Sequence, residues 1–497
     1  MIRKQELKQP LFYDAQQITP PAAGNFYLRL EEAVGNWEAL AQPFAAAFDA
    51  RMGRPTDPVV YLKIFLIGYL ENITYDTDLA ERIADSLAIR KFLGYALTEA
   101  PPEHSSISRN RALIGQRCDM DQVLERVVGL CIAQGLVEGK EAAVDSTLIP
   151  ANASLSSLRS IKTGKGVQEH LREVRERNKT NETPETLKVS NEEFRSGSDE
   201  DARVTQKPGT PRGMYYKATH VTDGANGVIL GAGCERADVA DIEAAKPVLE
   251  RSQRTLQEHE LALETVVGDA GYDAGHFHAA VEQMGASPLT NYKQDKGQKP
   301  DGFCKWDFVY DTAGDCYLCP AGQRLRPHHS SRCDGRIYRR ERADCEGCPH
   351  RQKCMGQAQA RHIVRRPHEE SRERNIARCH TEEGRAALRR RRHIVEPPFG
   401  HMKTYGGMSR INCRGKLKAA VKVVLAAVAW NLIKLVGALT RRAEEGPAGL
   451  PCCAAGWIVR VMRMLRTSLL HSLRSVCSHV TSPVYHWHDP SKATVLR

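Results

Sequence analysis

Two aspartates stand where the chemistry of phosphoryl transfer would need carboxylates. Asp145 follows the apolar run 142–144, and Asp269 stands just after a similar run at 265–267. Both runs have the composition of β-strands, and a side chain at the end of a strand can point into an open crevice. Two divalent cations held by carboxylates roughly 3.5–4 Å apart can activate a water and stabilise the leaving oxygen of a phosphodiester. The pattern predicts DNA strand chemistry.

A third carboxylate, Glu396, lies in a strongly basic segment. Arg392 and Lys403 stand four residues before and seven after it, offsets that share one face of a helix. Residues 385–418 contain ten Lys or Arg and one acid, Glu396, which matches a phosphate backbone better than an ordinary solvated surface. Pro397 and Pro398 favour the alternative that a helix begins at the prolines, with Glu396 just before its first turn.

The blocks AAVDSTLIPANAS, TVVGDAGYD and RRHIVEPPFGHMK resemble those of the DDE-type transposases of bacterial insertion sequences. In that family an RNase H-like domain supplies Asp, Asp and Glu in this order. The resemblance covers roughly residues 10–440 and implies that Asp145, Asp269 and Glu396 hold Mg²⁺ or Mn²⁺. It also implies that Arg392 and Lys403 contact phosphates. Many members carry Tyr where this chain has Arg389, so no role is carried over to that position.

Residues 53–115 are predicted to form a compact helical unit. Asp57 followed by proline is a helix start signal, and a further helix is expected to open after Ser105 or Ser106. A helix-turn-helix arrangement and a helical bundle without DNA contact both fit this pattern. A similar helical region precedes the first Asp in the family, so Arg109 and Arg111 are expected to touch DNA.

The elements that position the acids are strands with one intervening helix. After a polar stretch at 160–212, expected to be a flexible insertion or linker, strand-like runs return at 214–233 with a hairpin turn at 223–227. A helix from about 241 to 259 precedes the strand that ends at Asp269. This order predicts an α/β fold with a mixed sheet of the RNase H type flanked by helices. The apolar stretch 419–439 contains Lys422 and Lys434, which favours a core helix over a membrane span.

Seven of the fifteen cysteines lie between residues 304 and 354, and they include two Cys-x2-Cys pairs. In a reducing compartment this spacing favours zinc over disulfides, with scattered structural thiols as the alternative. Related transposases carry a comparable cluster in an insertion before the Glu. The resemblance therefore implies Cys319, Cys345, Cys348 and Cys354 as zinc ligands, with Cys316 as a substitute.

Five segments are expected: an N-terminal helical, DNA-binding domain (1–135), the first part of the catalytic domain (136–300), a Cys-rich insertion (301–370), the end of the catalytic domain (371–442) and a basic tail (443–497). The tail is either an extra binding helix or an unselected extension. The first residues lack the apolar core of a signal peptide, so a cytoplasmic, nucleoid-associated bacterial protein is expected.

The expected function is that of an insertion-sequence transposase, which binds the terminal inverted repeats of its element, cuts the DNA at the ends and joins them to a target. Such a protein would act as a homodimer or a higher synaptic complex, without a membrane. The alternatives are a catalytically inactive DNA-binding relative and a zinc-dependent nucleic-acid-binding module. Asp273, four residues after Asp269, is expected to be dispensable.

Overall fold

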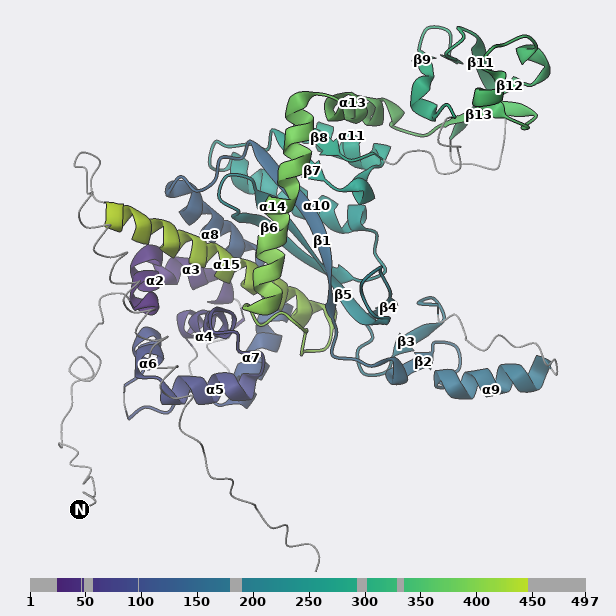
Figure 1. Ribbon diagram of the computed structural model, residues 1–497. Coiled ribbons are helices and arrows are strands. Elements are labelled where there is room, and N and C mark those ends of the chain that lie inside the picture. Colours follow the sequence, from purple (N-terminus) through teal and green to yellow (C-terminus); the bar gives the residue numbers. More distant parts are fainter. Residues whose placement is uncertain are drawn as a thin grey trace, which may run out of the picture. The chain divides into compact units, whose positions relative to one another are not determined.

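The computed structural model describes residues 25–45, 47–48, 57–96, 98–178, 190–292, 302–328 and 335–445 (Figure 1). The chain divides into one compact unit up to Gly437 and a second from Ala438 onward. Residues 446–497 lie outside the described residues, so both interpretations of the basic tail remain untested.

The chain begins its described part with a group of helices, which confirms the predicted helical unit. They are α2 (Phe26–Val34), α3 (Trp37–Ala45), α4 (Pro58–Leu70), α5 (Asp76–Asp85), α6 (Leu87–Leu93), α7 (His104–Arg117) and α8 (Asp121–Ala133). As expected, Asp57 caps α4 by accepting a hydrogen bond from the backbone N–H of Val59. Helix α7 begins at His104, just before the predicted start. Helix α4 is apolar all round and mostly buried, as is typical of a helix enclosed by others.

A mixed sheet follows these helices and confirms the expected α/β fold class. Its strands are β1 (Glu141–Pro150), β4 (Arg203–Thr205), β5 (Gly213–Asp223), β6 (Ile229–Arg236), β7 (Thr265–Gly268) and β8 (Ser287–Thr290). The order is β4-β5-β1-β7-β8, with β6 also paired to β5. Strand β1 is antiparallel to β5 and parallel to β7, and β7 is parallel to β8. The predicted hairpin turn joins β5 to β6, where Asp223 accepts a hydrogen bond from the N–H of Ala225.

Helices cover both faces of this sheet. Helix α10 (Asp241–Gln257) lies so close to β6 that a Cβ at Gly233 would stand 2.8 Å from Cγ2 of Val248. The opposite face packs against α14 (Glu382–Thr404), whose Ile394 and Val395 share a buried cluster with Ala143 of β1. Figure 1 shows α14 running across the strands. Two further helices, α11 (Gly275–Gln283) and α13 (Glu369–Cys379), pack against β8.

The stretch 160–212 is not simply a linker, contrary to the expectation. Strands β2 (Leu158–Ser160) and β3 (Phe194–Ser196) pair with each other, and α9 (Val167–Asn178) lies between them in sequence. Strand β4 joins the main sheet, where its Arg203 is buried beside Asp238. An edge strand needs only one paired side and tolerates polar residues, which is why its composition did not reveal it.

The segment expected to be a Cys-rich insertion forms a separate antiparallel sheet with its own core. The strands are β9 (Val309–Asp311), β10 (Cys316–Leu318), β11 (Arg324–His328), β12 (Arg336–Glu341) and β13 (Ala360–Arg365), with the short helix α12 (Arg351–Met355) between the last two. They are ordered β13-β12-β11-β10-β9. The core consists of Phe308, Tyr317, Leu325, Tyr338 and Ile363.

The last described helix, α15 (Lys416–Glu445), fits the prediction of a core helix. By length and composition the span Lys416–Glu444 could cross a membrane, with a mean hydropathy of 1.9, but 72% of that window is buried inside the protein. The side chain of Asn431 both donates to and accepts from the backbone of Ile229 at 2.8 Å. The helix is thereby tied to strand β6.

Candidate active site

Asp145 lies in the middle of β1, not at its end as the sequence suggested, because β5 continues to pair with β1 as far as Pro150. On its other side β1 pairs with β7 only up to Ala143 and Val267. Strand β7 then ends at Gly268, and Asp269 follows directly. Asp145 and Asp269 are therefore neighbours at the place where the two parallel strands separate.

The carboxyl group of Asp145 is half-buried and held from two sides. Its Oδ1 accepts a hydrogen bond from the N–H of Ser146 at 2.7 Å, and its Oδ2 lies 3.1 Å from the guanidinium of Arg391 on α14. Burial raises the pKa of Asp145, and the nearby charge of Asp269 raises it further, whereas the Ser146 N–H and Arg391 lower it. The two aspartates thus interact electrostatically.

Asp269 combines a helix-capping role with its place beside Asp145. Its Oδ1 accepts a hydrogen bond at 2.7 Å from the N–H of Gly271, in the short 3-10 turn Ala270–Tyr272. The hydroxyl of Tyr272 in turn lies 3.1 Å from that of Ser146 on β1. This contact ties the loop that carries Asp269 to the strand that carries Asp145.

Glu396 lies inside one continuous helix, so the alternative of a helix starting at the prolines is wrong. Helix α14 runs through Pro397 and Pro398 without a break. The prolines remove two helical N–H donors. Burial of Val395, Pro398 and Met402 on the sheet side of α14 offsets this loss and keeps the helix intact.

The offsets of Arg392, Glu396 and Lys403 place them along one side of α14, as expected. Glu396 and Arg392 are exposed and lie 3.4 Å apart as an ion pair. Lys403 is half-buried and donates a 2.6 Å hydrogen bond to the hydroxyl of Thr147 on β1, and burial lowers its pKa. Among the described residues, no hydrogen bond or ion pair joins Glu396 to either aspartate.

The aspartate pair suits a hard divalent cation, although within the described ranges no three His, Cys, Asp or Glu side chains are close enough to hold a metal. Asp145 is a half-buried carboxylate whose charge is opposed by that of Asp269. A cation between two such groups offsets both the repulsion and the cost of burial, and oxygen ligands are those that Mg²⁺ and Mn²⁺ prefer.

Two residues near Asp145 were missed by sequence reasoning. Arg391 belongs to the run of four arginines at 389–392, from which the spacing argument selected only Arg392. His220 lies directly opposite Asp145 in the β1–β5 pair, and its ring stacks on Phe399 of α14. Only the strand register and the helix packing reveal these neighbours.

Arg111 is not placed to touch DNA, contrary to the expectation. Its side chain is buried, pairs with both oxygens of Asp76 and lies over the ring of Phe65 at 4.9 Å. Arg109, on the same helix α7, is exposed. Residues two apart on a helix point in nearly opposite directions, so one face could not present both side chains.

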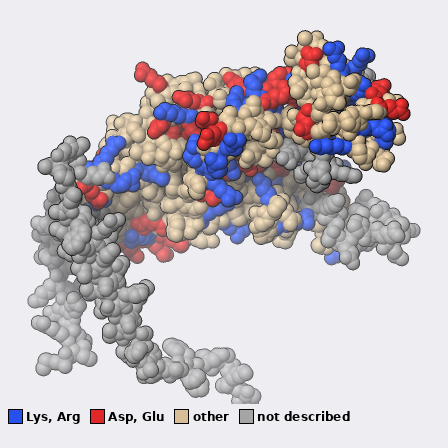
Figure 2. Space-filling view, turned by 45° about the horizontal axis from the view of Figure 1, so that its top comes forward, with Lys and Arg blue, Asp and Glu red and all other residues tan. Residues whose placement is uncertain are grey.

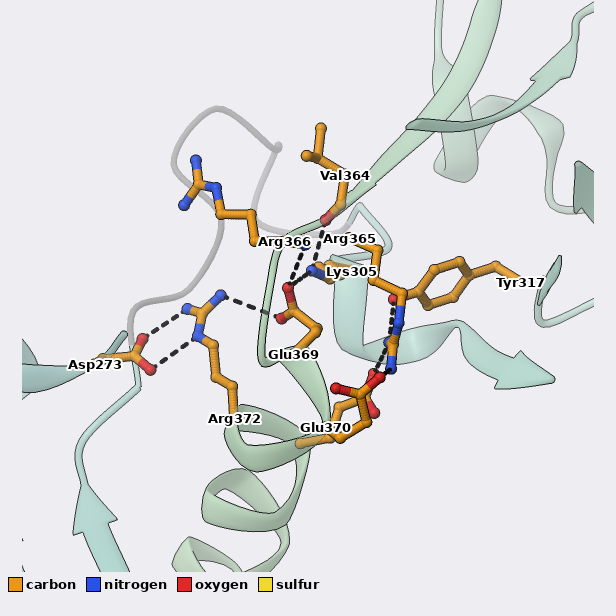
Figure 3. Close-up of polar contacts among 10 residues, drawn as sticks. Asp273, Lys305, Tyr317, Val364, Arg365, Arg366, Glu369, Glu370 and Arg372 are labelled. Atoms are coloured by element: carbon orange, nitrogen blue, oxygen red, sulfur yellow. Dashed lines mark hydrogen bonds and ion pairs between the residues drawn. The ribbon is translucent and has the colours of Figure 1, made fainter. Parts of the chain in front are cut away.

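Asp273, four residues after Asp269, has a structural role. Its side chain is fully buried and accepts hydrogen bonds from Arg372 at 2.9 and 2.6 Å. Arg372 also approaches Glu369, which pairs with Lys305 at 2.8 Å (Figure 3). This chain of ion pairs joins the loop after Asp269 to the Cys-rich segment.

The four cysteines expected to bind zinc line one cavity of about 340 Å³. Burial raises the pKa of the Cys354 thiol, nearby Arg361 lowers it, and the neighbouring Cys319, Cys345 and Cys348 raise it. The Sγ of Cys319 also accepts a hydrogen bond from the N–H of Gln323 at 3.3 Å. Cysteine sulfurs are the ligands that Zn²⁺ prefers, but among the described residues no three of these side chains lie close enough together to hold an ion. Cys316 is buried elsewhere, on β10.

The basic side chains of the segment 385–418 are partly paired with acids of the protein itself. On the face drawn in Figure 2, basic and acidic side chains are interspersed. Several arginines and lysines of the segment 385–418 pair with acids of the protein itself: Arg390 with Glu141 at 2.6 Å, and Lys416 with Glu235 at 2.7 Å. Part of the positive charge of this segment is therefore already neutralised within the protein.

Two family models match this chain. The model described as "Transposase DDE domain" matches residues 318–436, which include Glu396. The model described as "Transposase domain (DUF772)" matches residues 14–113. A search of curated proteins found no match.

Two solved structures illustrate the similarity found by structural comparison. One is a piggyBac transposase synaptic complex with hairpin DNA, with 10% identity and a TM-score of 0.31 over 86% of this chain and 77% of that chain. The other is a Mos1 transposase paired-end complex with a left transposon end, with 11% identity and a TM-score of 0.16 over 48% of this chain and 61% of that chain. Likenesses this weak carry no argument about this chain.

Proposed function

We propose that this chain, which matches two transposase family models over residues 14–113 and 318–436, is a DDE-type transposase that performs metal-dependent cleavage and strand transfer at the ends of an insertion sequence. The observation that carries the proposal is the adjacency of Asp145 and Asp269 where β1 and β7 separate. The presence of all three acids argues against an inactive relative.

In this proposal Asp145, Asp269 and Glu396 form the catalytic centre on a sheet of the RNase H type. Asp145 and Asp269 hold divalent Mg²⁺ or Mn²⁺ on the sheet, and Glu396 approaches from α14 when DNA is bound. The bound cations would supply the Lewis acidity that activates a water or a DNA 3′-hydroxyl and stabilises the leaving oxygen. Arg391 keeps the Asp145 carboxylate in place through its 3.1 Å contact.

Arg392 and Lys403 contact phosphates near the scissile bond. Arg392 is exposed beside Glu396, so its guanidinium is accessible to a DNA strand laid along this side of α14. Lys403 extends from the same side toward Thr147 of β1. Arg109, exposed on α7, contributes to recognition of the element ends.

The Cys-rich segment holds a structural Zn²⁺ through Cys319, Cys345, Cys348 and Cys354. Their shared cavity, and the influence of the other three thiols on Cys354, support this ligand set over one that includes Cys316. We place the protein in the bacterial cytoplasm on the nucleoid, acting on its terminal inverted repeats and a target DNA. Joining two ends requires at least a homodimer in a synaptic complex, and no membrane is involved.

A cleavage assay tests this function. Purified protein is incubated with a duplex that carries candidate element ends, with Mg²⁺, with Mn²⁺ or with EDTA, and strand cuts are mapped at nucleotide resolution. Cuts at the element boundary that need Mg²⁺ or Mn²⁺ support the proposal. Specific end binding without any metal-dependent cut would favour an inactive DNA-binding relative.

A further inference from the structure

A second cavity, of about 680 Å³, lies in the Cys-rich segment beside α12 and β13. Five of its sixteen lining residues are Lys or Arg, and among the residues that the structure describes none of its walls is formed by Asp or Glu. A hollow lined by one sign of charge concentrates the electrostatic field and attracts the opposite charge. The cavity is therefore suited to an anion.

Two of the five cations already have carboxylate partners. Arg372 pairs with Asp273 and Glu369, and Lys305 pairs with Glu369 (Figure 3). These two side chains belong to the ion-pair chain that fixes the wall of the cavity. They shape the wall of the cavity, while the paired carboxylates offset their positive charge.

The other three cations, Lys353, Arg361 and Arg366, make no ion pair with a carboxylate in the described parts of the chain. Lys353 lies 4.7 Å from the centre of the Phe303 ring, which holds its ammonium group without neutralising it. Arg366 is exposed, and Figure 3 shows its guanidinium directed away from Glu369.

Arg361 adds an unmet hydrogen-bonding requirement. It donates to the backbone carbonyls of Phe303 at 3.0 Å and Cys354 at 3.3 Å, so the guanidinium is held in place while its charge stays uncompensated. Its Nε is buried and has no acceptor among the described residues. Burying such a donor without an acceptor costs free energy.

We propose that this cavity binds the phosphodiester backbone of DNA without regard to base sequence, at a site separate from the acids and from α14. The inference rests on the proposed function, because DNA is the polyanion that the protein handles. The cations come from different elements, the helix α12, the strand β13 and the residue that follows it. Charges distributed in this way suit successive phosphates of a strand better than a single small anion.

The test uses the full-length chain with the double substitution Lys353→Gln and Arg366→Gln, two exposed side chains whose replacement leaves the core untouched. Binding to an element-end duplex and to an unrelated duplex is titrated at several salt concentrations. We expect both affinities to fall together, on the order of tenfold at low salt. The slope of log K against log salt should decrease by roughly two units, one for each lost phosphate contact.

The matched control is the double substitution Arg324→Gln and Arg326→Gln. It removes the same charge from exposed side chains of the same segment that do not line the cavity. This control should keep the wild-type salt slope. The proposal would be overturned if both double variants lost DNA affinity equally, or if the Lys353/Arg366 variant lost none.

A last arm separates DNA from free phosphate. Inorganic phosphate is added at constant ionic strength, and the increase in melting temperature that it causes is measured for the wild type and for the Lys353/Arg366 variant. The increase should be no larger in the wild type than in the variant. Stabilisation by phosphate with unchanged DNA affinity would mean a small-anion site and would overturn the proposal. Failure of the proposed function would give a different result: the wild-type protein would bind DNA but would show no metal-dependent cleavage.

Discussion

His220 lies directly opposite Asp145 across the β1–β5 pair, and its ring stacks on Phe399 with centroids 4.4 Å apart and planes 11° apart. The stack joins the strand beside the candidate catalytic aspartate to the helix that carries Glu396. Burial lowers the pKa of His220 to about 3, so the ring is neutral. This packing holds α14 against the sheet at the level of Asp145.

The stacked histidine should make the fold sensitive to acid. The unfolded chain binds a proton at His220 below a pH of about 6.5, whereas the folded protein resists protonation down to about 3. Stability is therefore lost as pH falls through this window. The variant His220→Phe keeps the stacked shape, so its melting temperature should fall less steeply than that of wild type between these limits.

The exposed His276 provides the control for that pH series. Replacing His276 by Gln should leave the wild-type slope of melting temperature against pH unchanged. If the His220→Phe protein is as acid-sensitive as the wild type, the stability loss originates elsewhere.

Asp273 should be needed for folding, although it takes no part in the proposed chemistry. Replacing it by Asn leaves Arg372 buried with one partner fewer, and breaking a buried ion pair costs about 3–5 kcal/mol. Chemical denaturation should show that loss in the free energy of unfolding. The double variant Asp273→Leu with Arg372→Met should be more stable than Asp273→Asn, because it removes both charges of the pair and Glu369 keeps its ion pair with Lys305.

Arg109 and Arg111 should give opposite phenotypes. Arg111→Gln should lower the melting temperature, because it breaks the buried pair with Asp76. Arg109→Gln should leave stability unchanged and reduce the preference for element ends over random DNA, at roughly 1–3 kcal/mol for a lost base contact. Competition binding with both DNAs measures the preference. An unchanged preference in Arg109→Gln would mean that this helix packs without reading DNA.

Zinc should remain bound under conditions that stop cleavage. Thiolate sites hold zinc far more tightly than carboxylates hold Mg²⁺, so brief EDTA treatment should abolish cutting while elemental analysis still finds one zinc per chain, roughly. Cys348→Ser should lower the zinc content, whereas Cys316→Ser should not, because Cys316 lies outside the shared cavity. Purified wild-type protein without zinc would refute the cluster.

The sequence predicted those features that depend on local pattern. Residue periodicity and turn signals identified the N-terminal helices, the β5–β6 hairpin and the strand before Asp269. Features that depend on packing were missed. The continuous α14 needs the buried contacts that carry it through Pro397 and Pro398, and the edge strand β4 has too little apolar character to be recognised.

The candidate site also contains features that local sequence pattern predicts and features that depend on packing. Residue type and spacing predicted Asp145 and Asp269 as site residues, because each follows a short apolar run, and the fold brings these two side chains near each other. The burial of Arg111 and Asp273 could not be read from spacing, since each depends on a partner distant in sequence, Asp76 and Arg372. Partners of that kind become visible only when the chain is folded.

The most direct test of the catalytic centre is the cleavage rate of three single variants, Asp145→Asn, Asp269→Asn and Glu396→Gln, on a duplex with one element end and Mg²⁺. Each substitution nearly preserves side-chain volume and removes one carboxylate charge from the proposed metal site. We expect all three variants to bind the element end with close to wild-type affinity and to give no detectable cuts. Glu396→Gln is the most informative, since Glu396 contacts neither aspartate among the described residues. Cleavage at the wild-type rate by any one of the three variants would remove that residue from the catalytic centre and contradict the three-carboxylate mechanism.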